Sequence, residues 1–377
     1  MNNKDIHIGI VGAGRIGTAI YELLISSNSY KVSIADHIEQ KLHHDNYVQL
    51  KVTKPTYDGE NTQFKAFVND KSLIINALPY TENINLFKSC YNADVPYFDL
   101  SEDDGLDNYI KEAISPRFPG VPGYPDIPFT MPHCGLAPGM STVVANHLIS
   151  DFKIVKDVKI RVGALSQNAT NKLRYHTSWS GDGLVNEYIG DCQIVQKGKF
   201  TVVPALSGYE KITIDGHEYE AFHTSGGIGT FAKTLSDIYP FVNVNYKTLR
   251  RIGHHDYVDF LVNDLGLPQH ELTKIFKNHI PTTRKDVVIL YVNVRGSSDD
   301  THYYDTQYSE RTYLKVFKPE IINGRYMTAI EYTTAIGMLA MVELYLKEKL
   351  PQEGYVKQES VKLTDALYTN FGNYYRE

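Results

Sequence analysis

A glycine-rich turn near the amino terminus is the part of this sequence whose residue types and spacing most clearly suggest chemistry. The apolar run 6–11 meets the segment 12–17, Gly-Ala-Gly-Arg-Ile-Gly, and a helix-like pattern follows over 18–25. A second apolar run over 31–35 then ends on Asp36, about 20 residues beyond the glycines. This order of strand, tight turn, helix start and second strand with a terminal acid is typical of a dinucleotide-binding unit.

Each residue of this unit has its own physical role. Gly12 allows the tight turn, Gly14 lets the backbone approach a pyrophosphate, and Gly17 permits the helix to pack against the strand. The helix start offers unpaired N–H groups and a partial positive charge to the anion. An ionised Asp36 accepts from a ribose hydroxyl but repels a 2′-phosphate, so the sequence predicts NAD rather than NADP. FAD and a turn that binds nothing are the alternatives.

Further polar residues follow other predicted strands. The run 72–78 ends at Pro79, where the main chain passes the cofactor in such domains, and acidic residues follow the run 95–100. The run 127–131 leads to a histidine and a cysteine. Because ligands bind at the carboxyl ends of parallel strands, all these residues are candidates for the active site. The predicted cofactor-binding residues are Gly12, Gly14, Arg15, Ile16, Gly17, Asp36, Leu78 and Pro79, and the predicted catalytic residues are Asp103, His133 and Cys134.

Each catalytic candidate has an alternative structural interpretation. Among Asp99, Glu102 and Asp103, one carboxylate is expected to orient an amine or act as a base, with Asp103 favoured, while the others cap a helix or face solvent. His133 either shuttles protons at neutral pH or is bonded to backbone at the strand end. Cys134 is either a nucleophile or a packed thiol beside the substrate.

A second group of candidates lies in the middle of the chain. Trp179, the single tryptophan, is expected either to form a rigid wall for an aliphatic substrate or to belong to the core. Glu187 binds either an ammonium group or a neighbouring basic side chain, and the segment 224–227 either holds a carboxylate through backbone N–H groups or is a simple turn. The predicted substrate-binding residues are Asp99, Tyr175, Trp179, Asp182, Glu187 and Thr224.

Two smaller motifs give further predictions. The pair at 250–251, Arg-Arg, is expected to form a solvated patch or an ion pair, with capture of a substrate carboxylate as the minority interpretation. The adjacent histidines at 43–44 and 254–255 point to different faces of a regular element, and no carboxylate or cysteine completes a ligand spacing. No metal site is therefore predicted.

Two kinds of scaffold must position these residues. Strands alternating with helices over 1–140 predict an α/β fold with a Rossmann-type doubly wound parallel sheet. From 141 to 325 longer strands and an Asp215-Gly216 turn signal predict a second, mainly antiparallel α+β domain for substrate and dimerisation. A helical pattern over 328–350 is expected to return the segment 326–377 to the first domain.

Composition excludes several classes of protein. A chain of 377 residues with 42% hydrophobic and 22% charged residues can form two folded domains rather than a disordered chain. A net charge of −6 without a basic stripe argues against a nucleic-acid partner. Three scattered cysteines, no visible secretory signal and no apolar stretch long enough to span a bilayer predict a cytoplasmic protein without a disulfide framework or a membrane partner.

Longer motifs resemble the saccharopine dehydrogenase family in its broad sense, which includes lysine 6-dehydrogenases and carboxynorspermidine dehydrogenases. The resemblance is carried in order by the segments 12–17, 97–103 (Tyr-Phe-Asp-Leu-Ser-Glu-Asp), 134–141 (Cys-Gly-Leu-Ala-Pro-Gly-Met-Ser), 178–188 (Ser-Trp-Ser-Gly-Asp-Gly-Leu-Val-Asn-Glu-Tyr), 219–227 and 371–375. It implies hydride transfer between a nicotinamide ring and a carbon that bears an amine, then hydrolysis of the imine to an aldehyde. It also implies a homodimer.

Two departures from the family pattern separate its subfamilies. Glutamate-forming saccharopine dehydrogenases carry aspartate where this chain has Ala137, and arginine where it has Asp182. An arginine suits the carboxylates of saccharopine, whereas an acid suits an ammonium group. The resemblance therefore implies oxidation of a terminal amine on a lysine-like amino acid. Glutamate-forming saccharopine dehydrogenase, a carboxynorspermidine-type dehydrogenase acting on a polyamine-type substrate, and a non-catalytic dinucleotide sensor remain the alternatives.

Overall fold

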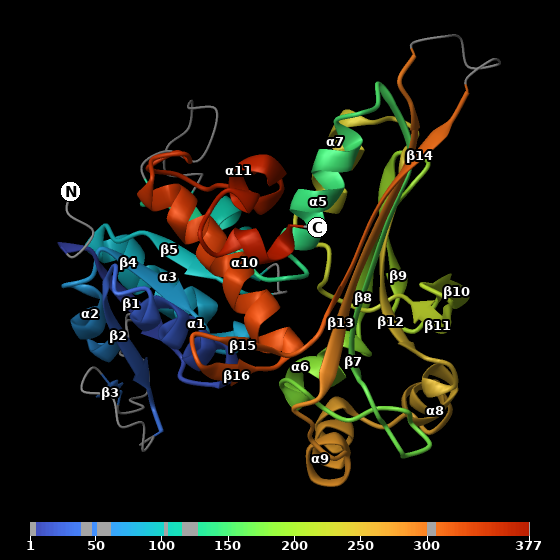
Figure 1. The fold of residues 1–377 in the computed structure, drawn as a ribbon, viewed down its shortest axis with the longest axis horizontal. Coiled ribbons are helices and arrows are strands. Elements are labelled where there is room, and N and C mark those ends of the chain that lie inside the picture. The colour runs from blue at the N-terminus through green and yellow to red at the C-terminus, as the bar shows by residue number, and fades with distance from the viewer. Residues whose placement is uncertain are drawn as a thin grey trace. The chain divides into compact units, whose positions relative to one another are not determined.

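The computed structural model describes residues 5–38, 47–50, 62–101, 105–114, 127–299 and 307–376. The chain divides into two compact units, and each contains its own large sheet (Figure 1). Unit 1 takes the chain up to residue 139 together with 322–324 and 334–376, and unit 2 takes 140–321 and 325–333. Residues 326–333, which the sequence analysis assigns to the first domain, thus group with unit 2.

Unit 1 is built on a parallel sheet with the strand order β3-β2-β1-β4-β5-β6. The strand order runs from β1 to β3 toward one edge and from β4 to β6 toward the other, so it reverses between β1 and β4 and creates the topological switch point where doubly wound sheets bind ligands. The predicted Rossmann-type sheet is confirmed. Its strands are β1 (His7–Val11), β2 (Lys31–Asp36), β3 (Tyr47–Gln49), β4 (Leu73–Asn76), β5 (Tyr97–Asp99) and β6 (Thr130–Met131).

Helices follow the strands of unit 1 in alternation, as the sequence predicts. They are α1 (Arg15–Ser26), α2 (Thr62–Val68), α3 (Asn83–Ala93) and α4 (Gly105–Tyr109), with single turns at Tyr80–Glu82 and Ile110–Ile114. Every residue of β1 and β4 is buried, which explains their continuous apolar runs. Phe67 of α2 and Phe87 of α3 pack with Ile74 of β4 in one hydrophobic core.

The carboxyl-terminal segment contributes helix α10 (Ala329–Leu346), helix α11 (Leu363–Leu367) and the turns Gln358–Ser360 and Gly372–Tyr375. Within unit 1 the ring of Tyr345 lies 4.4 Å from that of Phe129 and 5.8 Å from that of Phe98, so α10 packs on the β5–β6 side of the sheet. Among the described residues, α10 alone is long and apolar enough to cross a membrane by length and composition. Since 78% of it is buried inside the protein, it has the character of a core helix.

Unit 2 is built on a mixed sheet with the order β10-β11-β12-β7-β13-β14, and β8 joins β9 to β12. The pair β7–β12 is parallel and the other described pairs are antiparallel, so the predicted α+β domain is confirmed. Its strands are β7 (Ile154–Ser166), β8 (Asp191–Gln196), β9 (Lys199–Pro204), β10 (Glu210–Ile214), β11 (His217–Phe222), β12 (Asn243–Arg251), β13 (Asp286–Ser297) and β14 (Ser309–Phe317).

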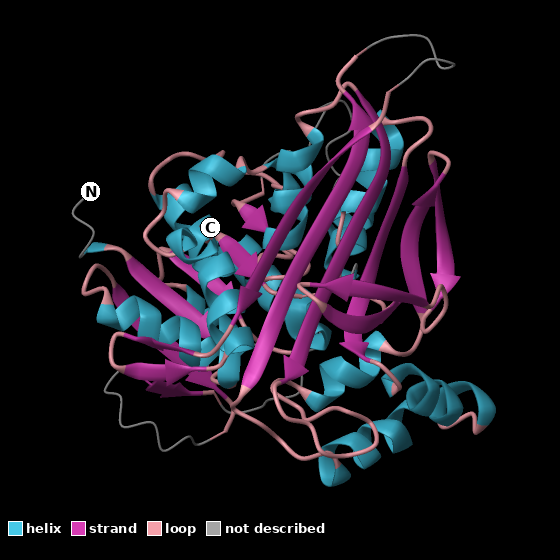
Figure 2. Cartoon of the chain, turned by 45° about the vertical axis from the view of Figure 1, so that its right-hand side comes forward, coloured by secondary structure: helices cyan, strands magenta, loops and turns pink. Residues whose placement is uncertain are grey.

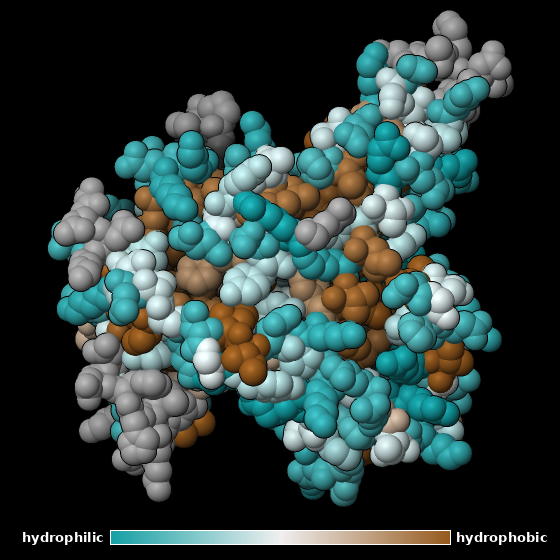
Figure 3. Space-filling view, viewed as in Figure 1, coloured by the Kyte–Doolittle hydropathy of each residue, from teal (hydrophilic) through white to brown (hydrophobic). Residues whose placement is uncertain are grey.

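The two faces of this sheet differ. Helices α5 (Met140–Ile149) and α7 (Phe231–Ile238) lie along one face, while no described helix covers the long strands on the face turned forward in Figure 2. On β14, Tyr313 and Phe317 are buried while Leu314 and Val316 are exposed, as the alternation of a strand requires. Figure 3 shows apolar side chains gathered at the surface around the strands labelled β8 and β12.

The remaining elements of unit 2 surround one end of its sheet. They are α6 (Gly181–Glu187), α8 (His254–Asp259) with the turn Phe260–Asp264, and α9 (Gln269–His279). A short hairpin, β15 (Glu320–Ile322) and β16 (Arg325–Met327), precedes α10.

Candidate functional site

The turn after β1 requires glycine at two positions for the chain's own packing. Gly12 has a φ of +105°, and a Cβ there would lie 2.6 Å from the carbonyl group of Ala77. A Cβ on Gly17 would lie 1.8 Å from the carbonyl oxygen of Gly12. These two glycines let β1, β4 and α1 approach one another, as the sequence analysis argues.

Gly14 differs from its two neighbours. Its φ is −69°, the residue is exposed, and a Cβ there would meet no described atom within 4 Å. Neither backbone conformation nor internal packing therefore explains a glycine at this position. The open space lies immediately before the first turn of α1, whose N–H groups attract anions. A dinucleotide pyrophosphate fits this combination of space and charge.

Asp36 ends β2 with its carboxylate next to the same turn. Oδ2 accepts a hydrogen bond of 2.7 Å from the Ala13 N–H, and Oδ1 accepts one of 3.2 Å from the Ile38 N–H. The ring Nδ1 of His37 lies 2.8 Å from Oδ1. The carboxylate is thus held beside the glycines, where the ribose of a dinucleotide bound at this turn would meet it.

The other predicted cofactor residues lie around the same turn. Leu78 follows β4, and its N–H donates to Asn76 Oδ1 over 3.0 Å. Pro79 is exposed and precedes the turn 80–82, and Arg15 and Ile16 begin α1 with their side chains exposed and half-buried. Unit 1 therefore brings this set together at its switch point.

Asp99 at the end of β5 is fully buried and forms several hydrogen bonds. Its Oδ1 accepts from the N–H groups of Ser101 and His133, each over 3.0 Å, and its Oδ2 accepts from the Tyr97 hydroxyl over 3.1 Å. Burial raises the pKa of this carboxyl group, against the opposing effect of His133. Asp99 consequently ties β5 to the loop after β6.

His133 is fully buried, with both ring nitrogens engaged. Nε2 lies 2.8 Å from Asp107 Oδ2, and Nδ1 lies 2.7 Å from the Ser101 carbonyl oxygen, so a doubly protonated ring donates to two acceptors. Burial opposes the charge, but Asp107 and Asp99 raise the pKa of His133 to about 10. The Tyr355 hydroxyl also donates to Asp107. The backbone-bonded interpretation therefore fits, and a proton shuttle at neutral pH does not.

The structure favours the packed interpretation of Cys134. Its side chain is buried, and Sγ donates to the Met131 carbonyl oxygen over 3.2 Å. Burial, together with the charge of Asp99, raises the pKa of this thiol well above its usual range. A neutral thiol is a poor nucleophile, so the catalytic prediction for Cys134 loses its support. Glu102 and Asp103 lie outside the described residues.

In unit 2, three predicted substrate residues gather around an arginine that the sequence analysis left as a minor candidate. Arg250 is almost completely buried; its Nη2 donates to Glu187 Oε2 over 2.7 Å, and its guanidinium lies 5.2 Å from the centre of the Tyr175 ring. Trp179 Nε1 donates to the Tyr175 hydroxyl over 3.1 Å. Glu187 thus pairs with a basic neighbour, which corrects its prediction as a binder of a substrate ammonium.

Tyr188 and His254 complete this group of side chains, the Arg250 cluster, and His254 is neutral in it. Arg250 Nε donates to the Tyr188 hydroxyl, which in turn donates to His254 Nε2, while His254 Nδ1 donates to the Leu173 carbonyl oxygen. Burial and the charge of Arg250 lower the pKa of His254 to about 3. Among the described residues no group of His, Cys, Asp and Glu could hold a metal ion, and positions 43–44 lie outside them.

Thr224 follows β11 and carries a buried hydroxyl that has no hydrogen-bond partner among the described residues. The next residue, Ser225, donates from its N–H to the Glu187 carbonyl oxygen and from Oγ to the Asn186 carbonyl oxygen. This places Thr224 at the carboxyl end of α6. An unpaired buried hydroxyl costs about 1–3 kcal/mol, which a polar ligand atom would offset. Asp182 lies in the first turn of α6, and its side chain is outside the described part.

Comparison with known proteins gives a consistent family assignment for both parts of the chain. A family model described as the saccharopine dehydrogenase NADP binding domain matches residues 8–116, and one described as the saccharopine dehydrogenase C-terminal domain matches residues 135–373.

Solved structures align over nearly the whole length. Apo saccharopine dehydrogenase (L-Glu forming) from Saccharomyces cerevisiae aligns over 98% of both chains with a TM-score of 0.73 and 16% identity. An engineered D-amino acid dehydrogenase bound to NADP⁺ aligns over 98% of both chains at 0.47 and 11%. A DAP dehydrogenase from C. glutamicum covers 99% of this chain and 98% of its own at 0.45 and 10%. At these identities the likeness concerns the fold.

Proposed function

This chain belongs to the saccharopine dehydrogenase family, as an oxidoreductase with an NAD(P)-binding domain, and we propose that it uses NAD to oxidise the terminal amine of a lysine-like amino acid. The observation that carries the proposal is the turn after β1. There Gly14 leaves space before a helix N-terminus, and Asp36 holds a carboxylate beside it. When bound, the nicotinamide would supply the hydride acceptor.

The choice of NAD rests on the charge of Asp36. Its two oxygens are fixed by the N–H groups of Ala13 and Ile38, so the carboxylate cannot turn away without losing both bonds. A fixed negative charge there accepts from ribose hydroxyls and repels a 2′-phosphate. The family model is named for NADP, so nucleotide preference is the first property to measure.

The choice of substrate rests on charges in unit 2. The chain has Asp182 where the glutamate-forming members of the family carry an arginine, and the buried Arg250 is already paired with Glu187. An acidic group suits an ammonium rather than another carboxylate. In this proposal Trp179 contacts the aliphatic chain and Thr224 Oγ1 binds a polar substrate atom, while Asp103 stays the predicted proton acceptor.

Turnover with a panel of amines tests the proposal. Purified protein would be incubated with NAD or NADP and with lysine, ornithine, saccharopine or a polyamine precursor, and the absorbance of the reduced nicotinamide followed. We expect turnover with lysine and NAD. Turnover with saccharopine alone would replace the proposal by the glutamate-forming activity, and NAD binding without turnover of any amine would favour a sensor.

We propose further that the protein is a cytoplasmic homodimer that uses the uncovered sheet face of unit 2. Leu314 and Val316 of β14 are both exposed on that face, and exposed apolar side chains gathered on one face favour an interaction site. The free cysteines, all buried, suit a reducing compartment.

A further inference from the structure

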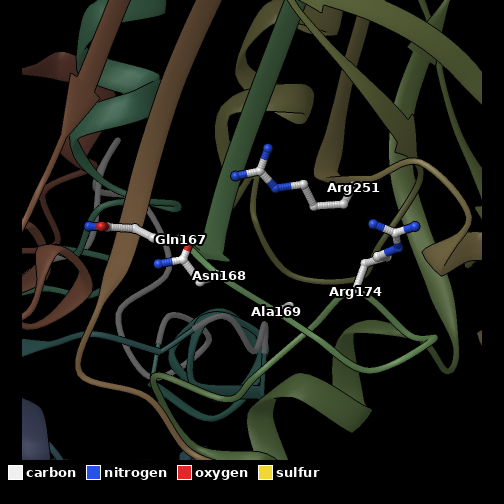
Figure 4. Close-up of a pocket in the computed structure, with 5 residues that line it drawn as sticks. All are labelled: Gln167, Asn168, Ala169, Arg174 and Arg251. Carbon is white, nitrogen blue, oxygen red and sulfur yellow. The ribbon is translucent and has the colours of Figure 1, made fainter.

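A pocket in unit 2 lies at the carboxyl ends of β7 and β12, which run parallel. It has a volume of ≈ 290 Å³ and is open to solvent. Its lining comes from the residues after β7, from the loop before α6 and from the last residue of β12: Gln167, Asn168, Ala169, Arg174 and Arg251. Figure 4 shows Gln167 and Asn168 on one side of the pocket and Arg174 on the other, with the Arg251 side chain extended toward Asn168 and the Gln167 amide turned away from the arginines.

Two positively charged side chains line the pocket, and no described residue supplies a counter-ion to either of them. In the described part of the chain neither Arg174 nor Arg251 forms an ion pair, and the Arg251 guanidinium lies over the Tyr219 ring, 5.6 Å from its centre. The adjacent Arg250, by contrast, is paired with Glu187. Two guanidinium groups in the lining give the pocket a positive charge that a bound anion would offset.

The backbone beneath these side chains is held in place. Asn171 brackets Arg174: its Oδ1 accepts from the Tyr175 N–H over 3.0 Å, its Nδ2 donates to the Tyr175 carbonyl oxygen over 2.7 Å, and its own carbonyl oxygen accepts from the Arg174 N–H. Tyr175 is completely buried, which anchors this loop in the core. On the other side, Gln167 donates from its backbone N–H to the Lys285 carbonyl oxygen and from Nε2 to the Asp286 carbonyl oxygen. The pocket is thus largely formed before any ligand arrives.

We propose that this pocket binds a small molecule through an oxyanion, a carboxylate or phosphate group whose oxygens accept hydrogen bonds from Arg174 and Arg251. A guanidinium presents a planar fork of N–H donors that matches both groups. The amide of Asn168 adds a neutral polar contact beside the charged ones. The inference concerns residues of unit 2 outside the Arg250 cluster, and it holds whether or not the proposed amine oxidation is correct.

The test measures anion binding by calorimetry, with glutarate and inorganic phosphate as separate probes at constant ionic strength. The chain is used at full length as wild type, R174Q, R251Q and the matched control R311Q, which removes an exposed arginine of β14. We expect saturable binding of at least one probe to wild type and R311Q, and at least tenfold weaker binding to R174Q and R251Q. The preferred probe identifies whether the group is a carboxylate or a phosphate.

Two results would overturn the proposal: no saturable binding of either probe to wild type, or equal affinity in R251Q and wild type. NADH binding by the same samples is expected to be unchanged, because Gly14 and Asp36 belong to unit 1. Because NADH binding reports on unit 1, the circular dichroism spectrum and the urea unfolding curve of each variant are the measurements that confirm that unit 2 is folded. If the wild type did not bind NADH, that result would count against the proposed function and not against this pocket.

Discussion

Gly17 lies against Gly12 so closely that a Cβ on Gly17 would come within 1.8 Å of the Gly12 carbonyl oxygen. Gly14, between them in the sequence, has no such neighbour among the described atoms. The three glycines of one motif therefore separate into two that the fold requires and one that the fold leaves open. This difference predicts opposite behaviour for two otherwise identical substitutions.

We expect G14A to fold normally and to bind dinucleotide at least tenfold more weakly than wild type. The φ of −69° accepts alanine, and replacing glycine at a compatible position even stabilises a protein by about 0.4–1 kcal/mol. G17A, the matched control, is expected to lose about 3 kcal/mol because a Cβ must displace backbone. Urea unfolding and NADH fluorescence measure the two properties. If G14A bound NADH as tightly as wild type, the proposal that the pyrophosphate binds at this turn would be wrong.

The charge of Asp36 predicts the nucleotide preference. Wild type is expected to bind NAD at least tenfold more tightly than NADP, and D36N should narrow this ratio by improving NADP binding. Asparagine retains an acceptor for the Ala13 N–H, and it loses the charge and the longer hydrogen bond from the Ile38 N–H, so the contact with the glycine turn should be kept. Fluorescence titration with both reduced nucleotides measures the ratio. A wild type that prefers NADP would show that charge at this position does not govern the choice.

The strands and helices were predictable from the sequence where the local pattern of residues matches the burial or the turn geometry of the folded chain. Strands buried on both faces read as continuous apolar runs, as in β1 and β4, and Asp215-Gly216 signals the β10–β11 hairpin through residues that accept positive φ. The β8–β9 hairpin was missed although its turn, Lys197-Gly198, has the same positive φ values. Lysine is not typical of that turn, so only Gly198 indicated it in the sequence.

The candidate site was predictable only in part, because its decisive contacts join distant positions. The cofactor residues follow a local motif, but Glu187 and Arg250 are 63 positions apart, and Asp107 and Tyr355 are 248 apart. No local spacing reveals such partners. The same limitation explains why His133 could be assigned to proton transfer, since its location after a strand was visible and its pairing with Asp107 was not.

The pairing of His133 with Asp107 predicts a pH dependence of stability. Its pKa of about 10 in the folded state lies above the unfolded value near 6.5, so the folded state binds more protons between these values. The free energy of unfolding should therefore fall as pH rises from 7 to 8, by about 1.2 kcal/mol. His254, with a folded pKa of about 3, adds only about 0.1 kcal/mol of opposite sign in this window. Urea unfolding at each pH measures the effect.

Two variants identify the source of that slope. H133N should show little change in unfolding free energy between pH 7 and 8, although it is less stable at pH 7 because Asp107 stays buried without its charged partner and keeps, among the described residues, only the bond from Tyr355. H147N, which replaces an exposed histidine of α5, should keep the slope of wild type. An equal slope in H133N and wild type would show that the ring is neutral at pH 7.

If the protein dimerises through the uncovered sheet face of unit 2, one charged substitution on that face should prevent the dimer from forming. L314D places a carboxylate among exposed apolar side chains of β14, so we expect the variant to sediment as a monomer while keeping its circular dichroism spectrum. K315D is the matched control, because neighbouring residues of a strand point to opposite faces. Analytical ultracentrifugation measures the mass. A monomeric wild type, or a dimer that survives L314D, would contradict this use of the face.

The Glu187–Arg250 pair predicts a large loss of stability when one partner is removed. E187A leaves a buried guanidinium without its counter-charge, which costs about 3–5 kcal/mol, whereas E187M combined with R250M removes both charges and should recover most of that loss. The exposed pair of Arg311 and Asp151 supplies the contrast, because D151A should cost no more than about 1 kcal/mol. Urea unfolding measures all of these variants. If E187A instead kept its stability and raised the KM for the amine, Glu187 would bind the substrate rather than hold Arg250.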